Sequence, residues 1–164
     1  MTNIAITGIG RIGKLVLKLL ISNDYKVTYL NELNGNPSSL LHSLEFDSIH
    51  GKWDASFKLD NEKISINKKI IQSTFSKNIE NLDLNNIDIL IDCTGAHNNS
   101  SDLKKYFDKG VKKVVVSAPV NEENIANIAY GVNQNIYNPN KHYIITAASC
   151  TTNCIAPIIK VIHE

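Results

Sequence analysis

One short segment constrains the fold of this chain more than any other: a glycine-rich turn between an apolar strand and an amphipathic helix. The segment Gly8-Ile9-Gly10-Arg11-Ile12-Gly13 follows the apolar stretch Asn3 to Thr7, and apolar residues then recur at helical spacing as far as Ser22. Glycines at this spacing also occur in ordinary turns, so the spacing alone is a weak signal. Between a strand and a helix, it predicts a loop that presents the N–H groups of the helix start to a pyrophosphate. Gly8 would permit the tight turn, Gly10 would let the backbone approach the ligand, and Gly13 would let the helix pack closely on the strand.

An acidic residue stands where such a loop needs one. The next predicted strand begins at Lys26 and ends at Asn31-Glu32, so Glu32 lies 19 residues after Gly13. A spacing of about 20 residues is expected for the carboxylate that binds the ribose of a dinucleotide. A carboxylate accepts hydrogen bonds from the ribose hydroxyls and repels a 2′-phosphate. The sequence therefore predicts NAD as the cofactor, in preference to NADP.

The rest of the chain alternates between strand and helix patterns. We expect further strands at 87–93, 111–117 and 143–147, and further helices at 40–44, 100–109 and 150–163. Residues 51–75 differ, because their apolar residues alternate on either side of a turn at 60–62, which is typical of an antiparallel hairpin. The predicted fold class is α/β, a Rossmann-type doubly wound and mostly parallel sheet with an inserted antiparallel hairpin.

Composition excludes several classes of function. Lys and Arg number 17 against 16 for Asp and Glu, and a net charge of +1 favours neither nucleic acid nor an anionic membrane as a partner. No apolar run reaches the ~18 residues of a membrane span, and we expect no signal peptide before the first strand. The three cysteines form no CxxC pair, so we expect no metal site, no disulfide framework and a cytoplasmic location.

The most reactive candidate in the chain is Cys150, in the segment Ala148-Ser149-Cys150-Thr151-Thr152-Asn153-Cys154. We place Cys150 in the first turn of the last helix, with Ser149 or a neighbouring threonine near the cap position. A helix N-terminus is a physical route to a reactive thiolate, and ligands of α/β sheets bind at the carboxyl ends of the strands. A lone cysteine is more often buried and inert. We interpret Cys154 in that way, packed inside, and Cys150 as the nucleophile.

A helix alone does not activate a thiol sufficiently. Lowering a thiol pKa by ~2.5 units requires roughly 3.4 kcal/mol, at about 1.36 kcal/mol per unit. A helix terminus supplies ~0.3–1 kcal/mol, and at best about 2 kcal/mol. The rest must come from a second group, normally a histidine. His142 precedes a predicted strand and His163 ends the last helix, so we expect both on the surface and neither beside Cys150. The chain by itself is therefore expected to turn over little or nothing.

At this point the sequence resembles a known family. Segments spread over the whole chain, in the family's order, resemble glyceraldehyde-3-phosphate dehydrogenase, and the SCTTNC block is highly specific. These segments are Thr7 to Gly13, Phe46 to Gly51, Ser117 to Pro119, Gly131 to Asn133 and Ala148 to Cys154. The resemblance implies an NAD-binding Rossmann domain at residues 1–149. It also implies that residues 150–164, the helix of the catalytic cysteine, begin a catalytic domain otherwise absent from this chain.

The same resemblance implies a reaction of glycolysis and a cytoplasmic homotetramer. Cys150 would attack the aldehyde of a small aldehyde phosphate, hydride would pass to NAD, and inorganic phosphate would open the resulting thioester. The residues that it assigns to the cofactor are Gly8, Gly10, Arg11, Ile12, Gly13, Asn31, Glu32, Thr94, Gly95, Ser117 and Ala118. Ser149 and Thr151 would help to hold a phosphate near the cysteine.

Three residues depart from the family's usual pattern. Thr7 replaces an asparagine, Glu32 replaces an aspartate, and His97 stands where a phenylalanine is frequent. Two alternatives to the phosphorylating enzyme also stay open. Residues 31–35, 44–53 and 146–150 look like the branch associated with arsenate-resistance operons, in which arsenate replaces phosphate and yields 1-arseno-3-phosphoglycerate. The other alternative is an isolated NAD-binding module without catalysis.

Overall fold

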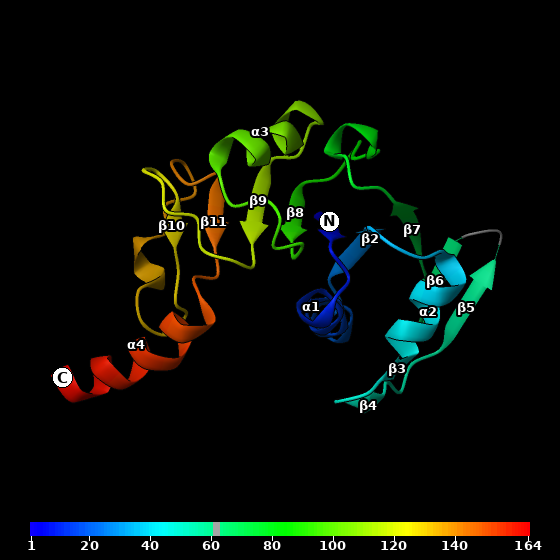
Figure 1. Ribbon diagram of the computed structural model, residues 1–164, viewed down its shortest axis with the longest axis horizontal. Helices are drawn as coiled ribbons and strands as arrows, with labels where there is room; N and C mark the ends of the chain where they lie inside the picture. The colour runs from blue at the N-terminus through cyan, green and yellow to red at the C-terminus, as the bar shows by residue number, and fades with distance from the viewer. Residues whose placement is uncertain (61–62) are drawn as a thin grey trace.

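The structure of the protein is a computed structural model that describes residues 1–60 and 63–164. Within these residues, strands join into a nine-stranded sheet of order β10-β11-β9-β8-β1-β2-β7-β6-β5 (Figure 1). A separate antiparallel pair joins β3 (Phe46–Asp47) to β4 (Gly51–Lys52). The strands of the large sheet are β1 (Asn3–Thr7), β2 (Lys26–Glu32), β5 (Phe57–Asp60), β6 (Lys63–Ile66), β7 (Lys69–Phe75), β8 (Ile89–Asp92), β9 (Lys113–Val116), β10 (Ala126–Asn127) and β11 (Ile144–Thr146).

Parallel and antiparallel parts meet at β7. Strands β10, β11, β9, β8, β1, β2 and β7 pair in parallel, whereas β7 with β6 and β6 with β5 pair antiparallel. The predicted fold class is confirmed, inserted hairpin included. The predicted turn at 60–62 lies partly outside the described residues, at 61–62. The sequence did not predict β7, which pairs with β2 on one side and with β6 of the hairpin on the other, and so extends the sheet.

Side-chain caps fix where two of the helices begin. They are α1 (Arg11–Ser22), α2 (Pro37–Glu45), α3 (Ser100–Asp108) and α4 (Cys150–His163), with short 3-10 turns η1 (Ile79–Asn81) and η2 (Gln134–Ile136). Helix α2 starts earlier than the predicted residue 40, because Asn36 and Ser39 form a reciprocal capping box and Pro37 has the backbone angle that a first helical residue needs. The side chain of Asn99 caps α3 in a similar way, by accepting from the N–H of Asp102.

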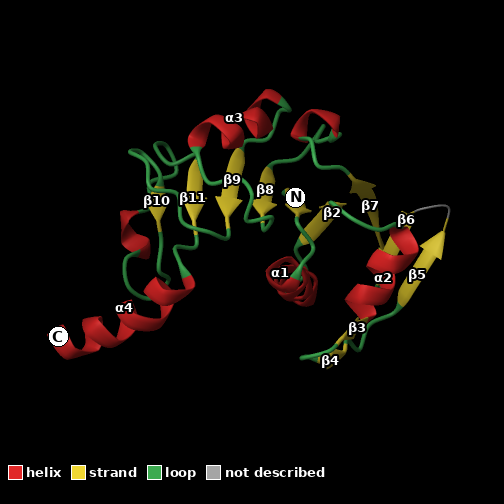
Figure 2. Cartoon of the chain, in the orientation of Figure 1, coloured by secondary structure: helices red, strands yellow, loops and turns green. Residues whose placement is uncertain are grey.

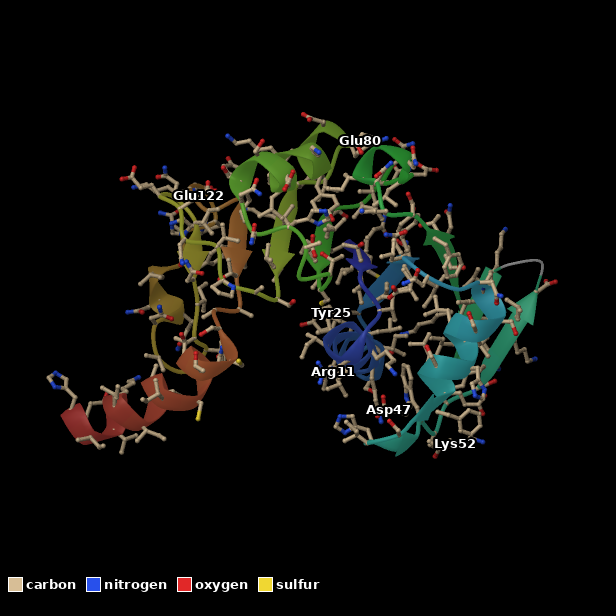
Figure 3. The ribbon with its side chains drawn as sticks, in the orientation of Figure 1. Arg11, Tyr25, Asp47, Lys52, Glu80 and Glu122 are labelled. Atoms are coloured by element: carbon tan, nitrogen blue, oxygen red, sulfur yellow. The ribbon has the colours of Figure 1, made fainter. Side chains whose placement is uncertain are left out.

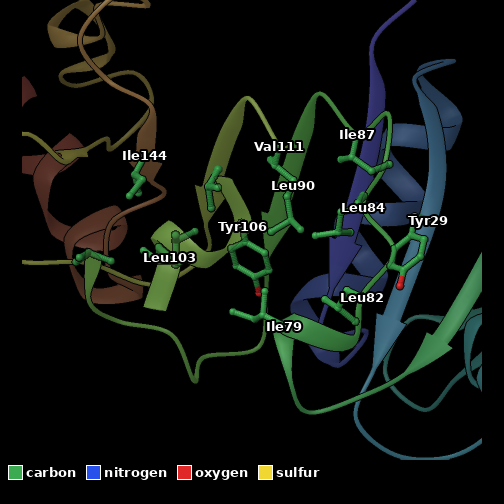
Figure 4. Close-up of a cluster of buried hydrophobic side chains, with 14 residues drawn as sticks. Tyr29, Ile79, Leu82, Leu84, Ile87, Leu90, Leu103, Tyr106, Val111 and Ile144 are labelled. Atoms are coloured by element: carbon green, nitrogen blue, oxygen red, sulfur yellow. The ribbon is translucent and has the colours of Figure 1, made fainter. Parts of the chain in front are cut away.

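Helices cover both faces of the sheet, as Figure 2 shows, with α3 and η1 on one face and α1 on the other. Alternate residues of β1 supply the two cores: Ala5 faces the α3 side, whereas Ile4 and Ile6 face the α1 side. On the α3 side, Leu103 and Tyr106 belong to the same buried cluster as Leu90 of β8 (Figure 4). A strand with apolar residues on both faces is buried on both, which explains the continuous apolar runs in the sequence.

The first strand marks the point where the strand order reverses. The chain passes from β1 to β2 on one side and later returns to β8 on the other, so β1 lies between them. Crevices outside the carboxyl ends of the strands at such a point are where ligands bind in open α/β sheets. The turn after β1 and the loop after β8 both end at this crevice. Among the described residues, no helix combines the length and the apolar character needed to cross a membrane.

Candidate cofactor and cysteine sites

The glycine turn is built around close backbone contacts. Gly8 has φ of +81°, and a Cβ there would lie 2.6 Å from the backbone nitrogen of Thr94. A Cβ on Gly13 would lie 2.0 Å from the carbonyl oxygen of Gly8, so helix α1 could not approach the strand end with any side chain at that position. Around Gly10, in contrast, a Cβ would meet nothing within 4 Å. Gly8 and Gly13 therefore permit close packing of the backbone, whereas Gly10 borders open space.

This open space lies beside the N-terminus of helix α1. Gly10 is the N-cap residue and offers no side-chain hydrogen bond to the helix. The first N–H groups of a helix have no carbonyl partner within the helix, so those of the first turn remain available to an anion. Arg11 and Ile12, the first two helical residues, are exposed, and Figure 3 shows Arg11 beside the α1 start. These residues fit the pyrophosphate of a dinucleotide.

Glu32 reaches across from β2 to this turn. Its Oε2 accepts a hydrogen bond from the N–H of Ile9 at 2.6 Å, and its Oε1 accepts from the N–H of Leu33 at 2.7 Å. The carboxylate therefore stands at the rim of the crevice with its position set by two backbone donors. Both oxygens of an ionised carboxylate accept more than one hydrogen bond, so capacity for ribose hydroxyls remains.

A cavity of about 520 Å³ extends from the glycine turn past Glu32. Its volume is in the range of ligand pockets. Of the predicted cofactor residues, the cavity is lined by Gly8, Gly10, Asn31, Glu32 and Thr94. The remaining predicted cofactor residues do not line it, although Gly13 sits directly behind Gly8; they are Arg11, Ile12, Gly13, Gly95, Ser117 and Ala118.

Asn31, which lines the cavity, also links neighbouring strands. Its buried side chain donates to the hydroxyl of Thr7 at 3.1 Å and to the carbonyl of Ser76 at 3.0 Å. Its Oδ1 accepts from the hydroxyl of Thr74 at 2.9 Å and from the N–H of Ser76 at 3.1 Å. A buried amide needs hydrogen-bond partners, and the partners of Asn31 come from β1 and from β7 and the residue that follows it. One side chain of β2 therefore ties the three strands together. Thr7, the residue that replaces an asparagine, thus keeps a partner for Asn31.

The opposite wall holds a polar cluster that the sequence analysis did not find. Asp92, the last residue of β8, is completely buried, and its carboxylate accepts from the hydroxyl of Thr94 at 2.6 Å and from the hydroxyl of Tyr106 at 3.0 Å. Nδ1 of His97 lies 2.7 Å from Oδ2 of Asp92, the same oxygen that accepts from Tyr106, whereas Thr94 donates to Oδ1. The contact with Asp92 raises the pKa of His97, while burial raises the pKa of Tyr106. The sequence signal that could have indicated this cluster is Asp92 at the end of an apolar strand, with His97 five residues later.

Residues after β8 and β9 lie against each other beside the turn. Ser117 follows β9, and its N–H donates to the carbonyl of Asp92 at 2.9 Å. Ser117 also contacts the thiol of Cys93, whose pKa is raised to about 11, mainly by burial. Gly95 is exposed with φ of +68°, and Ala118 is half-buried. The structure therefore brings Ser117 close to the loop after β8, at the carboxyl edge of the sheet.

Cys150 is the first residue of α4 and its thiol is exposed. The N-cap is Ser149, whose hydroxyl oxygen accepts from the N–H of Thr152 at 3.0 Å and lies 2.9 Å from the hydroxyl of Thr151. The residue before the cap, Ala148, is buried with φ of +56°, a backbone conformation that is costly for a residue with a Cβ. The sharp turn from β11 into α4 thus presents the cysteine at the sheet edge.

A small cavity of about 220 Å³ adjoins this turn. The N-cap residue Ser149 and Thr152 of α4 line it on one side, and Pro119 and Asn121 line it from the segment after β9. Ser149 therefore lies where a small anion could reach the N-terminus of α4, whereas Thr151 does not line the cavity. Cys150 itself remains outside it.

Two expectations about this segment need correction or refinement. Cys154 is exposed, so the prediction that it packs inside is wrong: α4 buries none of its residues, because no described element covers that side of the helix. His163 is exposed, as expected, but His142 is half-buried and its Nδ1 accepts from the N–H of Asn138 at 3.0 Å. No hydrogen bond or ion pair between described residues joins either histidine to Cys150.

Within residues 1–60 and 63–164, no group of three or more His, Cys, Asp or Glu side chains could hold a metal ion.

Comparisons with known proteins agree with this geometry. Residues 2–100 match the family described as glyceraldehyde 3-phosphate dehydrogenase, NAD binding domain. The whole chain is similar to glyceraldehyde-3-phosphate dehydrogenase of Geobacillus stearothermophilus, at 40% identity over 164 residues that cover 98% of this chain and 48% of the relative. The proteins named glyceraldehyde-3-phosphate dehydrogenase 3 in Nostoc sp. and glyceraldehyde-3-phosphate dehydrogenase 1 in Bacillus subtilis are each 37% identical over the same shares. The chain thus spans about half the length of these curated relatives, and NAD is the cofactor of the domain that it matches.

Proposed function

The chain belongs to the glyceraldehyde 3-phosphate dehydrogenase family, and from this membership we propose that it is the NAD-binding half of a phosphorylating aldehyde dehydrogenase. The substrates would be a small aldehyde phosphate and inorganic phosphate. The products would be an acyl phosphate and NADH. One observation carries the proposal: the glycine turn after β1 and Cys150 after β11 lie at the carboxyl ends of parallel strands in one sheet.

This shared edge places two kinds of chemistry within reach of one extended ligand. The free N–H groups at the start of α1 would hold the pyrophosphate, and Glu32 would accept hydrogen bonds from the adenosine ribose. Asn31, Thr94, Gly95, Ser117 and Ala118 would complete the cofactor contacts. NAD, when bound, supplies the acceptor for the hydride that leaves the aldehyde carbon. A cofactor that starts at Glu32 and runs past β8 and β9 would end near the turn that carries Cys150.

Cys150 would carry the covalent chemistry. Its Sγ bonds to the aldehyde carbon while the carbonyl oxygen gains a proton, which forms a thiohemiacetal. Loss of a hydride and of that proton leaves a thioester. Phosphate then attacks the thioester carbon, the C–S bond breaks, and the acyl phosphate leaves as the thiol is restored. Ser149 and Thr151 would hold the attacking phosphate through their hydroxyls, which lie 2.9 Å apart.

The second half of such an enzyme would supply what this chain lacks. No histidine contacts Cys150 among the described residues, and a helix N-terminus alone provides too little energy to activate a thiol. Helix α4 also exposes Ile158, Ile159, Val161 and Ile162, each at least 55% accessible. We propose that the further domain of the relatives packs on this apolar surface and brings the activating histidine. For the two halves together we propose a homotetramer. We propose the cytoplasm as its location, because free cysteines are typical of a reducing compartment.

Two other functions deserve comparison with this one. The relatives named above carry no arsenate-related description, so we propose phosphate as the attacking anion, and arsenate as the alternative. The remaining alternative is that the chain acts alone as an NAD-binding module. It is favoured by the exposed, unassisted Cys150 and would show as cofactor binding without turnover.

The test combines this chain with the second half of the Geobacillus stearothermophilus relative and follows NADH formation from glyceraldehyde 3-phosphate. We expect NADH production that depends on phosphate, and its loss in the Cys150→Ser variant. Cys154→Ser, one helical turn away, is the matched control and should retain activity. Activity that survives Cys150→Ser would contradict the mechanism, and a chain that fails to bind NAD in calorimetry would contradict the cofactor site.

A further inference from the structure

His97 is built into the wall of the cofactor cavity. It follows β8 in the segment Thr94-Gly95-Ala96-His97, and its side chain lines the same 520 Å³ cavity as Gly10 and Glu32. The imidazole is 17% exposed, so most of the ring is packed against protein while one edge remains open. A polar ring in this position differs chemically from an apolar one, because it can donate or accept a hydrogen bond.

The orientation of the ring is set by its neighbours. Nδ1 lies 2.7 Å from Oδ2 of Asp92 and 3.3 Å from the hydroxyl of Tyr106, whose ring meets the imidazole edge-on at 5.9 Å. Asp92 is completely buried and, when ionised, accepts hydrogen bonds only, so Nδ1 carries the proton that faces it. Nε2 makes no hydrogen bond with any described residue. This nitrogen is therefore the group left for a ligand.

The position of His97 along the cavity indicates which part of the ligand it meets. A dinucleotide with its pyrophosphate at Gly10 and its ribose at Glu32 has its adenine base farther along the cavity. That part is lined by the segment after β7 and by the residues that precede and begin α3, His97 included. The purine edge carries ring-nitrogen acceptors and one exocyclic amine donor.

We propose that His97 is a specificity-determining residue that reads the base of the dinucleotide through Nε2. In the neutral ring, whose Nδ1 proton points to Asp92, Nε2 is an acceptor and pairs with the exocyclic amine of adenine. In the protonated ring, Nε2 becomes a donor and favours a base that presents an acceptor there. The inference deepens the proposed function and rests on it, because it requires the dinucleotide to occupy this cavity.

Several charged or titratable groups face the imidazole and determine when it changes state. The hydrogen bond to Asp92 raises the pKa of His97, with burial opposing. Asp102 acts in the same direction as Asp92, and Lys105 acts against it. The groups that face His97 are Asp92 from β8 and Asp102, Lys105 and Tyr106 from α3, and the charged or titratable groups elsewhere in the cavity wall are Glu32, Lys77, Glu80 and Cys93. The amine-reading form is therefore populated on the alkaline side of the His97 titration, above the ordinary histidine range.

The experiment measures the Kd of this chain for two dinucleotides by calorimetry, from about pH 5.5 to about one pH unit above the midpoint of the His97 titration that NMR gives. The probes are NAD and nicotinamide hypoxanthine dinucleotide, in which a carbonyl replaces the exocyclic amine. We expect the hypoxanthine-to-adenine Kd ratio to rise about fivefold from the acidic to the alkaline end, as one neutral hydrogen bond is gained or lost. The midpoint should coincide with the titration of His97 followed by NMR.

Two variants sharpen the result. His97→Phe keeps a ring but removes Nε2, so its Kd ratio should be independent of pH, whereas His163→Phe, at the exposed end of α4, should behave as the unchanged chain. The pH series of the unchanged chain is itself decisive, even if His97→Phe does not fold. A ratio that stays constant with pH, or changes equally in His97→Phe, would overturn the inference while NAD binding persists. Absence of NAD binding at every pH would instead overturn the proposed function, and the inference with it.

Discussion

The carboxylate of Glu32 accepts a hydrogen bond from the backbone N–H of Ile9 across 2.6 Å, and so joins the end of β2 to the glycine turn after β1. The second oxygen is held by the N–H of Leu33. The residue that we propose as the determinant of cofactor preference is thus hydrogen-bonded to the turn that we propose as the pyrophosphate site. Its side chain spans the gap between two strand ends, and in the proposed site its charge would repel a 2′-phosphate.

Replacing that charge should change cofactor preference. Glu32→Gln keeps an oxygen that can accept from Ile9 but removes the negative charge, so we expect the Kd for NAD to rise about tenfold and the discrimination against NADP to fall more than that. Calorimetric titration with both cofactors measures the two effects. Glu123→Gln, at an exposed position away from the cavity, is the matched control. An unchanged ratio of the two affinities would contradict the assignment of Glu32.

The glycines of the turn should separate folding from binding. In Gly13→Ala the new Cβ would meet the carbonyl oxygen of Gly8 at 2.0 Å, and we expect a loss of about 3 kcal/mol or more in the free energy of unfolding. In Gly10→Ala nothing lies within 4 Å, so stability should change by no more than about 0.5 kcal/mol.

The same Gly10→Ala methyl group would project into the space that the pyrophosphate needs. We therefore expect its Kd for NAD to rise at least about tenfold, equivalent to 1.4 kcal/mol. Urea denaturation followed by calorimetry on the same preparations distinguishes the two variants. Equal stability of both variants would show that the close packing at Gly13 is not required.

The three cysteines should differ in reactivity, and the difference should depend on pH. Burial raises the pKa of Cys93 to about 11, while Cys150 and Cys154 are exposed. Because the thiolate is the reactive form, its population at Cys93 is small at about pH 8 and grows only as the pH approaches the raised pKa. Iodoacetamide at about pH 8 should therefore modify Cys150 and Cys154 well before Cys93, as peptide mass spectrometry would show. Modification of Cys93 at the same rate would mean that the loop after β8 opens.

The apolar surface of α4 should matter only when something covers it. Ile158 and Ile162 are 55% and 80% exposed, so the double substitution Ile158→Gln with Ile162→Gln should change the stability of this chain by less than about 1 kcal/mol. In the chain combined with a relative's second half, each buried isoleucine would contribute about 1.5 to 3 kcal/mol. Thermal denaturation of both forms, with and without the substitutions, measures the difference. A similar small effect in both forms would contradict the proposed packing on α4.

Local patterns of the sequence predicted the elements that need only local chemistry. The glycine turn, the amphipathic α1, the alternating hairpin and the start of α4 at Cys150 were all predicted from neighbouring residues, because backbone angles, caps and side-chain periodicity are set within a few positions along the chain. Glu32 was placed at the end of its strand for the same reason. The roles of the predicted site residues stay predictions.

Contacts between distant segments were decided only by the tertiary structure. The sequence did not place β7 beside β2, nor Asp92, His97 and Tyr106 around one buried carboxylate, since these contacts join residues whose relative position depends on the whole sheet. It misplaced Cys154, because an apolar helix face is buried only if another element covers it. Even at the glycine turn, the sequence determined the position of the turn and of Glu32 at its strand end. Only the folded chain placed the Glu32 carboxylate within hydrogen-bond distance of the N–H of Ile9.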